Sequence, residues 1–301
     1  MKLPPFTLVY QPSAGAKLQK AREARQLEEL GEHVKGLSGS LLSLKPALRS
    51  SLLRTVASSS DLDLSAQTVS RAAAEVTRQA KVDTVGLWDL SAQVGELPRV
   101  VETLNEAQPV ITFFEVQAAI QSGLISRPER MRAWAKERLG RPLTRKEAAS
   151  FASGVIFEEF EEKADKVRRG LGIDHLIGIV PALVASGDGP EVMWDLYSAG
   201  RSGNVLVSTV DVYAYAVEAG RPFEVAVATI ALSTRLSTLN PRAEFHQETR
   251  GCLFDFDDNR ADLVQGLRRL EIEPECLAKI RPRYREAALA MMTALQGLSK
   301  G

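Results

Sequence analysis

The chain has 301 residues, of which 45% are hydrophobic and 25% are charged, a composition typical of a globular protein that can bury a sizeable core. Lysine and arginine together number 38, as do aspartate and glutamate, so no overall charge attracts nucleic acid or an anionic membrane surface. This length favours two lobes or one enlarged domain.

Cys252 and Cys276 are the two cysteines of the chain, and prolines interrupt the short apolar run at its N-terminus. Few cysteines and no signal-peptide core favour a soluble, cytoplasmic protein with reduced thiols. No stretch reaches the roughly 18 uncharged apolar residues of a membrane span. The most apolar segment, residues 171–184, contains Asp174 and His175, and we expect a buried strand there with His175 as a core histidine.

Residues 1–140 are predicted to form a helix-rich α/β lobe. Its first part is expected to contain a strand at 3–10 and helices at 16–37, 41–56 and 65–80. Two strand-like runs at 82–90 and 109–116 then flank an amphipathic segment at 97–107. This alternation predicts a βαβ unit.

Residues 141–301 are predicted to form a second lobe with a small mixed sheet and packed helices. Thr144 and Glu147 have the spacing of a capping box, which predicts a helix to about Arg169 with a solvated acidic face. Three strands and then three helices are expected to follow, at 173–180, 191–197, 204–208, 210–219, 222–238 and 274–296. The predicted fold class is therefore α/β, or α+β.

The most informative pattern lies in residues 236–280, whose sequence is LSTLNPRAEFHQETRGCLFDFDDNRADLVQGLRRLEIEPECLAKI. His246 and Gln247 stand before Cys252, with four residues between Gln247 and Cys252, and an apolar pair follows. The segment closes with Glu-Pro-Glu-Cys276. This pattern resembles the archaemetzincin family of zinc metalloproteases, whose core is HExxHxxGxxHCx4C with a later CxxC.

The resemblance implies that the groups for zinc-dependent proteolysis have been replaced. It places Leu236 and Asn240 at the first two zinc-binding histidines, Ser237 at the catalytic glutamate and His246 at the third histidine. Leucine cannot bind zinc, and serine cannot serve as the carboxylate base. Pro241 is expected to end the helix that carries these positions. The resemblance therefore predicts a pseudo-metalloprotease.

The structural metal site of that family is reduced in the same way. The resemblance places Gln247, Cys252, Glu273 and Cys276 at its four cysteine positions, so two thiolates remain. We expect Cys252 and Cys276 to be buried, reduced and close in space, and we expect no bound metal or other cofactor. A two-thiolate site completed by Glu273 and by Asp255, Asp257 or Asp258 is the alternative.

A second chemistry is conceivable between residues 246 and 252. His246 as a base, Glu248 as its orienting carboxylate and Cys252 as a nucleophile would make a hydrolase of unknown class. The competing interpretation is a structural turn in which Arg250 pairs with Asp255 or Asp257. Sequence proximity alone favours the turn, because catalytic groups usually meet from distant parts of a chain.

The sequence predicts a catalytically inactive zincin-like protein that binds another protein, as a regulatory or scaffold subunit. The alternative is the hydrolase that uses His246, Glu248 and Cys252, and a structural subunit of a larger assembly is a third possibility. A binding role predicts an exposed apolar patch, whereas an enzyme predicts a concave pocket around His246. The pattern indicates neither nucleic acid nor membrane as a partner.

Overall fold

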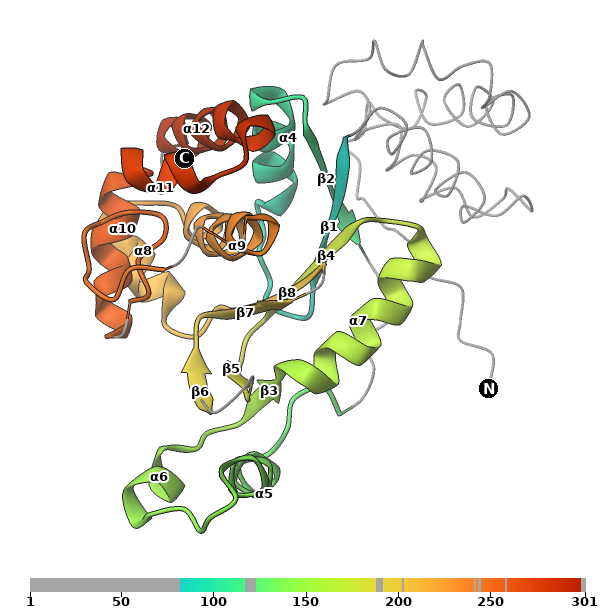
Figure 1. Cartoon of the computed structure of the whole chain (residues 1–301), viewed down its shortest axis with the longest axis vertical. Helices are drawn as coiled ribbons and strands as arrows, with labels where there is room; N and C mark the ends of the chain where they lie inside the picture. Colours follow the sequence, from blue (N-terminus) through green and yellow to red (C-terminus); the bar gives the residue numbers. More distant parts are fainter. Residues whose placement is uncertain are drawn as a thin grey trace.

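The computed structural model describes residues 82–298, apart from 117–122, 188–191, 202, 241, 243–244 and 258. The strand predicted at 3–10 and the helices predicted at 16–37, 41–56 and 65–80 lie outside the described residues. The described part is an α/β fold in which helices cover both faces of a mixed sheet (Figure 1).

A parallel βαβ unit opens the described chain. It consists of β1 (Asp83–Asp89), α4 (Leu97–Ala107) and β2 (Ile111–Val116), and β1 pairs with β2 in parallel. The amphipathic spacing of α4 explains its position, because its apolar residues are buried on one face. The βαβ unit predicted from the sequence is therefore confirmed.

The remaining elements form most of the second half of the chain. In chain order they are α5 (Pro128–Leu139), α6 (Arg145–Ser150), β3 (Gly154–Ile156), α7 (Phe157–Leu171), β4 (His175–Val180), β5 (Leu183–Ser186), β6 (Met193–Leu196), β7 (Ser198–Arg201), β8 (Asn204–Ser208), α8 (Val212–Ala219), α9 (Phe223–Leu239), the 3-10 helix η1 (Arg260–Asp262), α10 (Leu263–Arg269), α11 (Pro274–Lys279) and α12 (Pro282–Gly297).

The main sheet has the strand order β2-β1-β4-β8-β7, and β3, β5 and β6 form a second, smaller sheet. Strands β1, β2, β4 and β8 run parallel, whereas β7 pairs with β8 in antiparallel orientation and closes the sheet at one edge. The predicted division at residue 140 falls between β2 and β4, so strands from both predicted lobes share one sheet.

Successive side chains of the central strands point to opposite faces of the sheet, so they pack into two separate hydrophobic cores. Val205 and Val207 of β8 belong to the core shared with α4, α9 and α12, whereas Leu206 belongs to the core under α7. Figure 1 shows α4, α9 and α12 on one face of the sheet and α7 on the other. At Gly178 of β4 a Cβ atom would lie 2.7 Å from the ring of Phe160, so glycine permits this close approach of α7.

Two predicted helices are corrected. The capping box at Thr144 is present, but its helix, α6, ends at Ser150, and β3 intervenes before α7 begins. The C-terminal helix is divided into α11 and α12, because the residue before Pro282 adopts an extended conformation and the proline then begins a new helix. Among the described residues, no helix is long and apolar enough to cross a membrane.

Candidate metal centre and the adjoining cavity

A tight turn between α9 and η1 carries Cys252. One carboxylate oxygen of Asp255, Oδ2, accepts hydrogen bonds from the backbone N–H groups of Arg250, Gly251 and Cys252, at 2.7, 2.5 and 3.1 Å. Gly251 has a φ of 80°, in the left-handed region that glycine adopts without strain. The predicted tight bend is present. Its stabilising contact is a carboxylate bound to main-chain groups, not an ion pair between Arg250 and an aspartate.

Main-chain hydrogen bonds also fix the two segments that approach this turn. The N–H of His246 donates to the carbonyl of Phe254 at 2.7 Å, and the N–H of Phe256 donates to the carbonyl of His246 at 2.9 Å. On the other side of the turn, the N–H of Leu253 donates to the carbonyl of Glu271 at 2.8 Å. These hydrogen bonds hold His246, Cys252 and the start of α11 next to one another.

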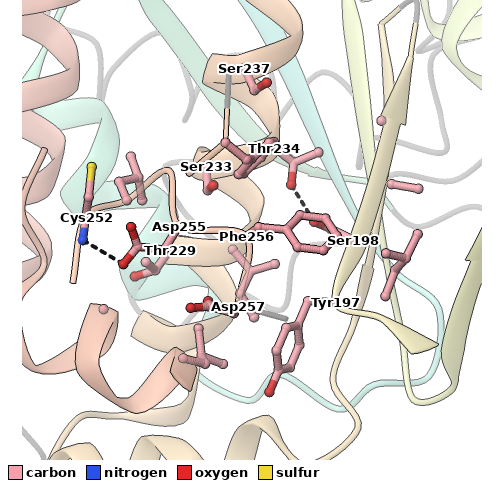
Figure 2. A pocket seen from close by; sticks show the side chains of 18 of the residues that line it. Tyr197, Ser198, Thr229, Ser233, Thr234, Ser237, Cys252, Asp255, Phe256 and Asp257 are labelled. Atoms are coloured by element: carbon pink, nitrogen blue, oxygen red, sulfur yellow. Dashed lines mark hydrogen bonds between the residues drawn. The ribbon is translucent and has the colours of Figure 1, made fainter. Parts of the chain in front are cut away.

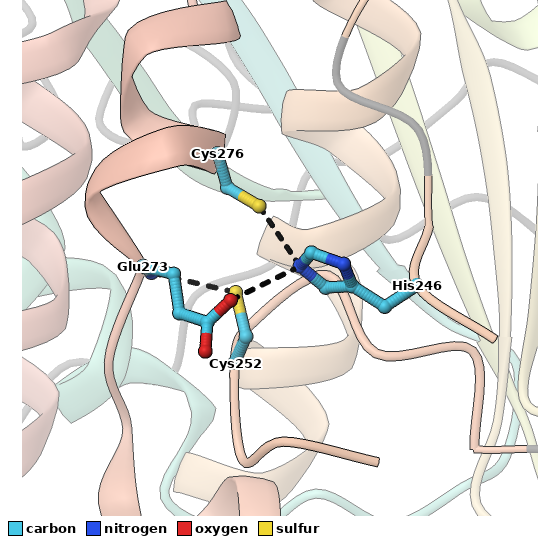
Figure 3. Close-up of side chains that lie close together, drawn as sticks. All are labelled: His246, Cys252, Glu273 and Cys276. Carbon is cyan, nitrogen blue, oxygen red and sulfur yellow. Dashed lines mark hydrogen bonds and ion pairs between the residues drawn. The ribbon is translucent and has the colours of Figure 1, made fainter. Parts of the chain in front are cut away.

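Four side chains meet there: His246, Cys252, Glu273 and Cys276 (Figure 3). Each side chain offers one atom that could bind a metal, and these four atoms all lie within 4.8 Å of one another. The Nε2 atom of His246 lies 2.9 Å from Sγ of Cys276 and 3.6 Å from Oε2 of Glu273. Both cysteines are buried and free, and they lie together as the sequence led us to expect.

The electrostatics of this cluster disfavour a free thiolate. Burial, and next the neighbouring Cys252, raise the pKa of the Cys276 thiol well above its usual value. Cys276 is therefore a protonated thiol in the absence of a cation, and its S–H can donate to Nε2 of His246. Arg250 supplies positive charge at the rim, with Nη1 lying 3.4 Å from Glu273 and 2.7 Å from Glu275.

The chemistry of the donor set fits a zinc ion. An imidazole nitrogen, two cysteine sulfurs and a carboxylate oxygen are all zinc ligands in proteins, and four protein ligands are typical of a closed structural site. The N–H of Glu273 lies 3.5 Å from Sγ of Cys252, which adds outer support to one donor. Among the described residues no other group of three or more such side chains meets this closely.

His246 joins the two cysteines where the sequence pattern had placed Gln247. Gln247 is exposed, whereas the His246 side chain retains 9% exposure and points into the cluster (Figure 3). The alternative metal site expected from the sequence took its fourth donor from Asp255, Asp257 or Asp258, whereas the fourth side chain of the described cluster is His246. It was missed because the resemblance assigned His246 to the catalytic centre, one residue away from the structural position.

A cavity of about 170 Å³ lies beside this cluster, between β7 and α9 (Figure 2). One wall is the run of five residues Leu196–Gly200, which leads from β6 into β7, and the opposite wall is α9. Five hydroxyl side chains of α9 line it: Thr229, Ser233, Thr234, Ser237 and Thr238. Cys252 also reaches the cavity wall, so the cavity and the four-residue cluster share one loop.

The four positions that the resemblance assigned to the catalytic centre do not converge on this cavity. Leu236 is 1% exposed and packs in the main core. Asn240 is also buried, and its amide donates to the carbonyl of Leu236 at 2.7 Å and accepts from the N–H of Arg281 at 2.8 Å. Of the four, Ser237 alone lines the cavity, since His246 points into the cluster.

Two carboxylates supply negative charge at the cavity floor. Asp255 and Asp257 line it, and within the described residues the Oδ1 atom of each has no hydrogen-bond partner. Burial, and next the charges of Asp255 and Asp262, raise the pKa of Asp257 to about 7. The negative charge of these carboxylates would favour a basic group in the cavity.

The other titratable candidates lie apart from the cluster. Glu248, the proposed orienting carboxylate, is 83% exposed and pairs with Arg250 at 3.6 Å instead of contacting His246. His175 begins β4, and its Nε2 atom lies 2.6 Å from Nη2 of Arg235. Burial, and next the charge of Arg235, lower the pKa of His175 to about 2, so its ring is neutral at physiological pH.

Comparisons with known proteins add little to this description. No described protein family and no curated protein matches the sequence. Among solved structures, the crystal structure of a zinc-dependent peptidase from Methanocorpusculum labreanum is similar to this chain, with 12% identity and a TM-score of 0.38. The alignment covers 66% of this chain and 100% of the peptidase. A likeness of this size leaves the chemistry to be argued from the chain's own residues.

Proposed function

We propose that this chain is a catalytically inactive zincin-like protein that binds an extended segment of a partner protein, as a regulatory or scaffold subunit. The observation that carries the proposal is the wall of α9 that faces the cavity. It presents serine and threonine hydroxyls, and the described lining of the cavity includes no histidine. Hydroxyls in a cavity can bind a ligand, but they cannot replace the imidazoles and the carboxylate base of a zinc protease.

The position of the cavity supports an extended partner. Five consecutive residues, Leu196–Gly200, line it, and β7 is the last strand in the order of the main sheet. Edge strands offer main-chain donors and acceptors to an added strand, and side-chain pockets beside them supply specificity. The carboxylates of Asp255 and Asp257 favour a segment that places a lysine or arginine in the cavity.

Two further observations favour binding over the hydrolase alternative. Tyr213 and Val217 of α8 are 67% and 48% exposed and stand one helical turn apart, which gives the surface an apolar pair of the kind that partners cover. The cavity lining does not include His246, and Glu248 does not orient it. The raised pKa of Cys276 and the burial of both thiols also oppose a nucleophilic cysteine.

The test is a library of short extended peptides, displayed against the full chain, with each selected peptide measured by fluorescence polarisation. We expect micromolar binders with a basic residue at one fixed position. Ser237→Phe fills the cavity and should weaken their binding at least about tenfold, whereas Ala149→Phe adds the same bulk on the exposed face of α6 and should not. Equal binding by both variants would contradict the cavity as the site.

The same peptides test the proposal that the chain is catalytically inactive. Incubated with the zinc-loaded chain and analysed by mass spectrometry, they should remain intact. Zinc-dependent cleavage that a chelator abolishes would contradict the proposal.

A further inference from the structure

We propose that His246, Cys252, Glu273 and Cys276 bind one zinc ion, which ties the loop at 245–257 to α11. This inference is independent of the partner-binding role. It assigns His246 to a structural centre instead of a catalytic one, and it gives the chain a metal that the ligand count from the sequence did not predict.

The geometry of the four donors is close to that of a bound metal. Ligand atoms around a tetrahedral zinc lie about 3.5 Å apart, since zinc–sulfur and zinc–nitrogen bonds are about 2.3 and 2.0 Å long. Here all four donor atoms already lie within 4.8 Å of one another, and two of the separations are 2.9 and 3.6 Å. Small side-chain rotations are enough to close the site.

The charges of the site balance when zinc is bound. Two thiolates and the Glu273 carboxylate contribute three negative charges, and the neutral imidazole of His246 contributes none. One Zn²⁺ leaves a single negative charge, and the guanidinium of Arg250, 3.4 Å from Glu273, compensates it. Zinc binds cysteine as the thiolate, so binding releases thiol protons to solvent and metal affinity rises with pH.

The backbone holds the donors in place from both sides. The carboxylate of Asp255 fixes the turn that carries Cys252, and the pairing of Leu253 with Glu271 sets this turn beside the start of α11. All four ligands come from the protein, and the cysteines are 3% and 1% exposed. A closed, buried site of this kind stabilises a fold and leaves no open position for a substrate.

Elemental analysis of the full chain, incubated with one equivalent of Zn²⁺ and then desalted, provides the first test. We expect about one zinc per chain for the wild type. Two variants of adjacent residues distinguish which of them binds zinc. His246→Ala removes the proposed ligand, and Gln247→Ala removes the residue that the sequence pattern placed at the structural metal site. His246→Ala should hold less than about 0.2 zinc per chain and Gln247→Ala about one. The reverse pattern, or an empty wild type, would overturn the proposal.

Two measurements on the wild type apply even if a ligand variant does not fold. Loading with Co²⁺ should produce intense sulfur-to-cobalt charge-transfer absorption in the near ultraviolet, which requires a cysteine–metal bond. Removal of zinc by a chelator should lower the melting temperature by roughly 10 °C. Absence of the sulfur band would refute cysteine ligation, and an unchanged melting temperature would refute the tie between the loop and α11.

Discussion

The cavity between β7 and α9 and the cluster at His246 share one loop, yet they differ in kind. On the cavity side, five hydroxyls of α9 and two carboxylates line a space without a described histidine. On the cluster side, four donors of three chemical types meet within 4.8 Å. A closed set of four protein donors suits a structural metal, whereas an open space lined by hydroxyls and carboxylates suits a ligand, so the two regions are suited to different roles.

The difference also shows which side chains the fold depends on. Leu236 and Asn240 are buried and serve the core and the end of α9, whereas Ser237 faces open space. Two positions that the resemblance assigns to catalytic zinc ligands, Leu236 and Asn240, thus hold side chains that serve packing and hydrogen bonding. The cluster donors are instead held by main-chain bonds on both sides, which is the arrangement expected where a ligand completes the structure.

Asp255→Ala should have the largest effect, because Asp255 serves both regions. Its Oδ2 atom accepts three backbone N–H groups, two of them at buried residues, and leaving these donors unpaired should cost about 2 to 4 kcal/mol of unfolding free energy. Zinc affinity should also fall more than about tenfold, because the turn that holds Cys252 is released. Chemical denaturation and a competitive zinc indicator measure the two effects.

Asp262→Ala is the matched control for that variant. Asp262 accepts one side-chain hydrogen bond, from Thr249 at 2.8 Å, and its loss should cost about 1 kcal/mol. Equal losses of stability in the two variants would show that the main-chain bonds of Asp255 do not hold the turn.

Asp257→Asn should raise the free energy of unfolding by an amount that depends on pH and is smaller than the loss expected for Asp255→Ala. The pKa of this carboxyl is about 7 in the folded protein, against 3.8 for the free group, so the folded state binds the proton more tightly than the unfolded chain. The stability that the folded state gains from binding this proton is present at low pH and is lost as the pH rises from about 4 to about 7. Asparagine cannot ionise and tolerates the φ of 51° at this position.

The variant should therefore be more stable than the wild type at pH 8 by roughly 1 to 3 kcal/mol, and about equally stable at pH 4. Urea denaturation at the two pH values measures this difference. A gain that is the same at both pH values would mean that the ionisation of Asp257 is not its source.

Glu248→Gln should change least. The side chain is 83% exposed, and an exposed ion pair such as that with Arg250 contributes little, so stability should remain within about 0.5 kcal/mol. Zinc content and peptide affinity should match the wild type. If the chain proves to hydrolyse any ester or peptide substrate and Glu248→Gln abolishes that activity, the hydrolase alternative replaces the binding role.

Much of the fold follows from local sequence patterns. The helix at 97–107, the strand at 204–208 and the helix near 222–238 appear within a residue or two of their predicted bounds. Each has a strong local pattern: amphipathic spacing, a short β-branched run, and a long apolar stretch that ends before a proline. The short strand β3 was missed because its pairing with β5 is a contact made across nearly thirty residues.

The candidate site was predicted only in part. The expectation that Cys252 and Cys276 lie together came from the resemblance, and in the structure the turn at Gly251 and the proline that opens α11 position them. The sequence did not identify His246, instead of Gln247, as the donor that joins the two cysteines, because adjacent residues point in different directions. The main-chain pairing of His246 with Phe254 and Phe256 decides which of them joins the cysteines, and this pairing depends on the turn being folded.

Diffraction at the zinc absorption edge, on crystals of the full chain grown with Zn²⁺, tests the contrast between cluster and cavity most directly. The account predicts one anomalous peak at about 2.3 Å from the sulfurs of Cys252 and Cys276, in contact with His246 and Glu273. The cavity between β7 and α9 should contain none. A zinc ion bound in the cavity, or a cluster without a peak, would contradict the account.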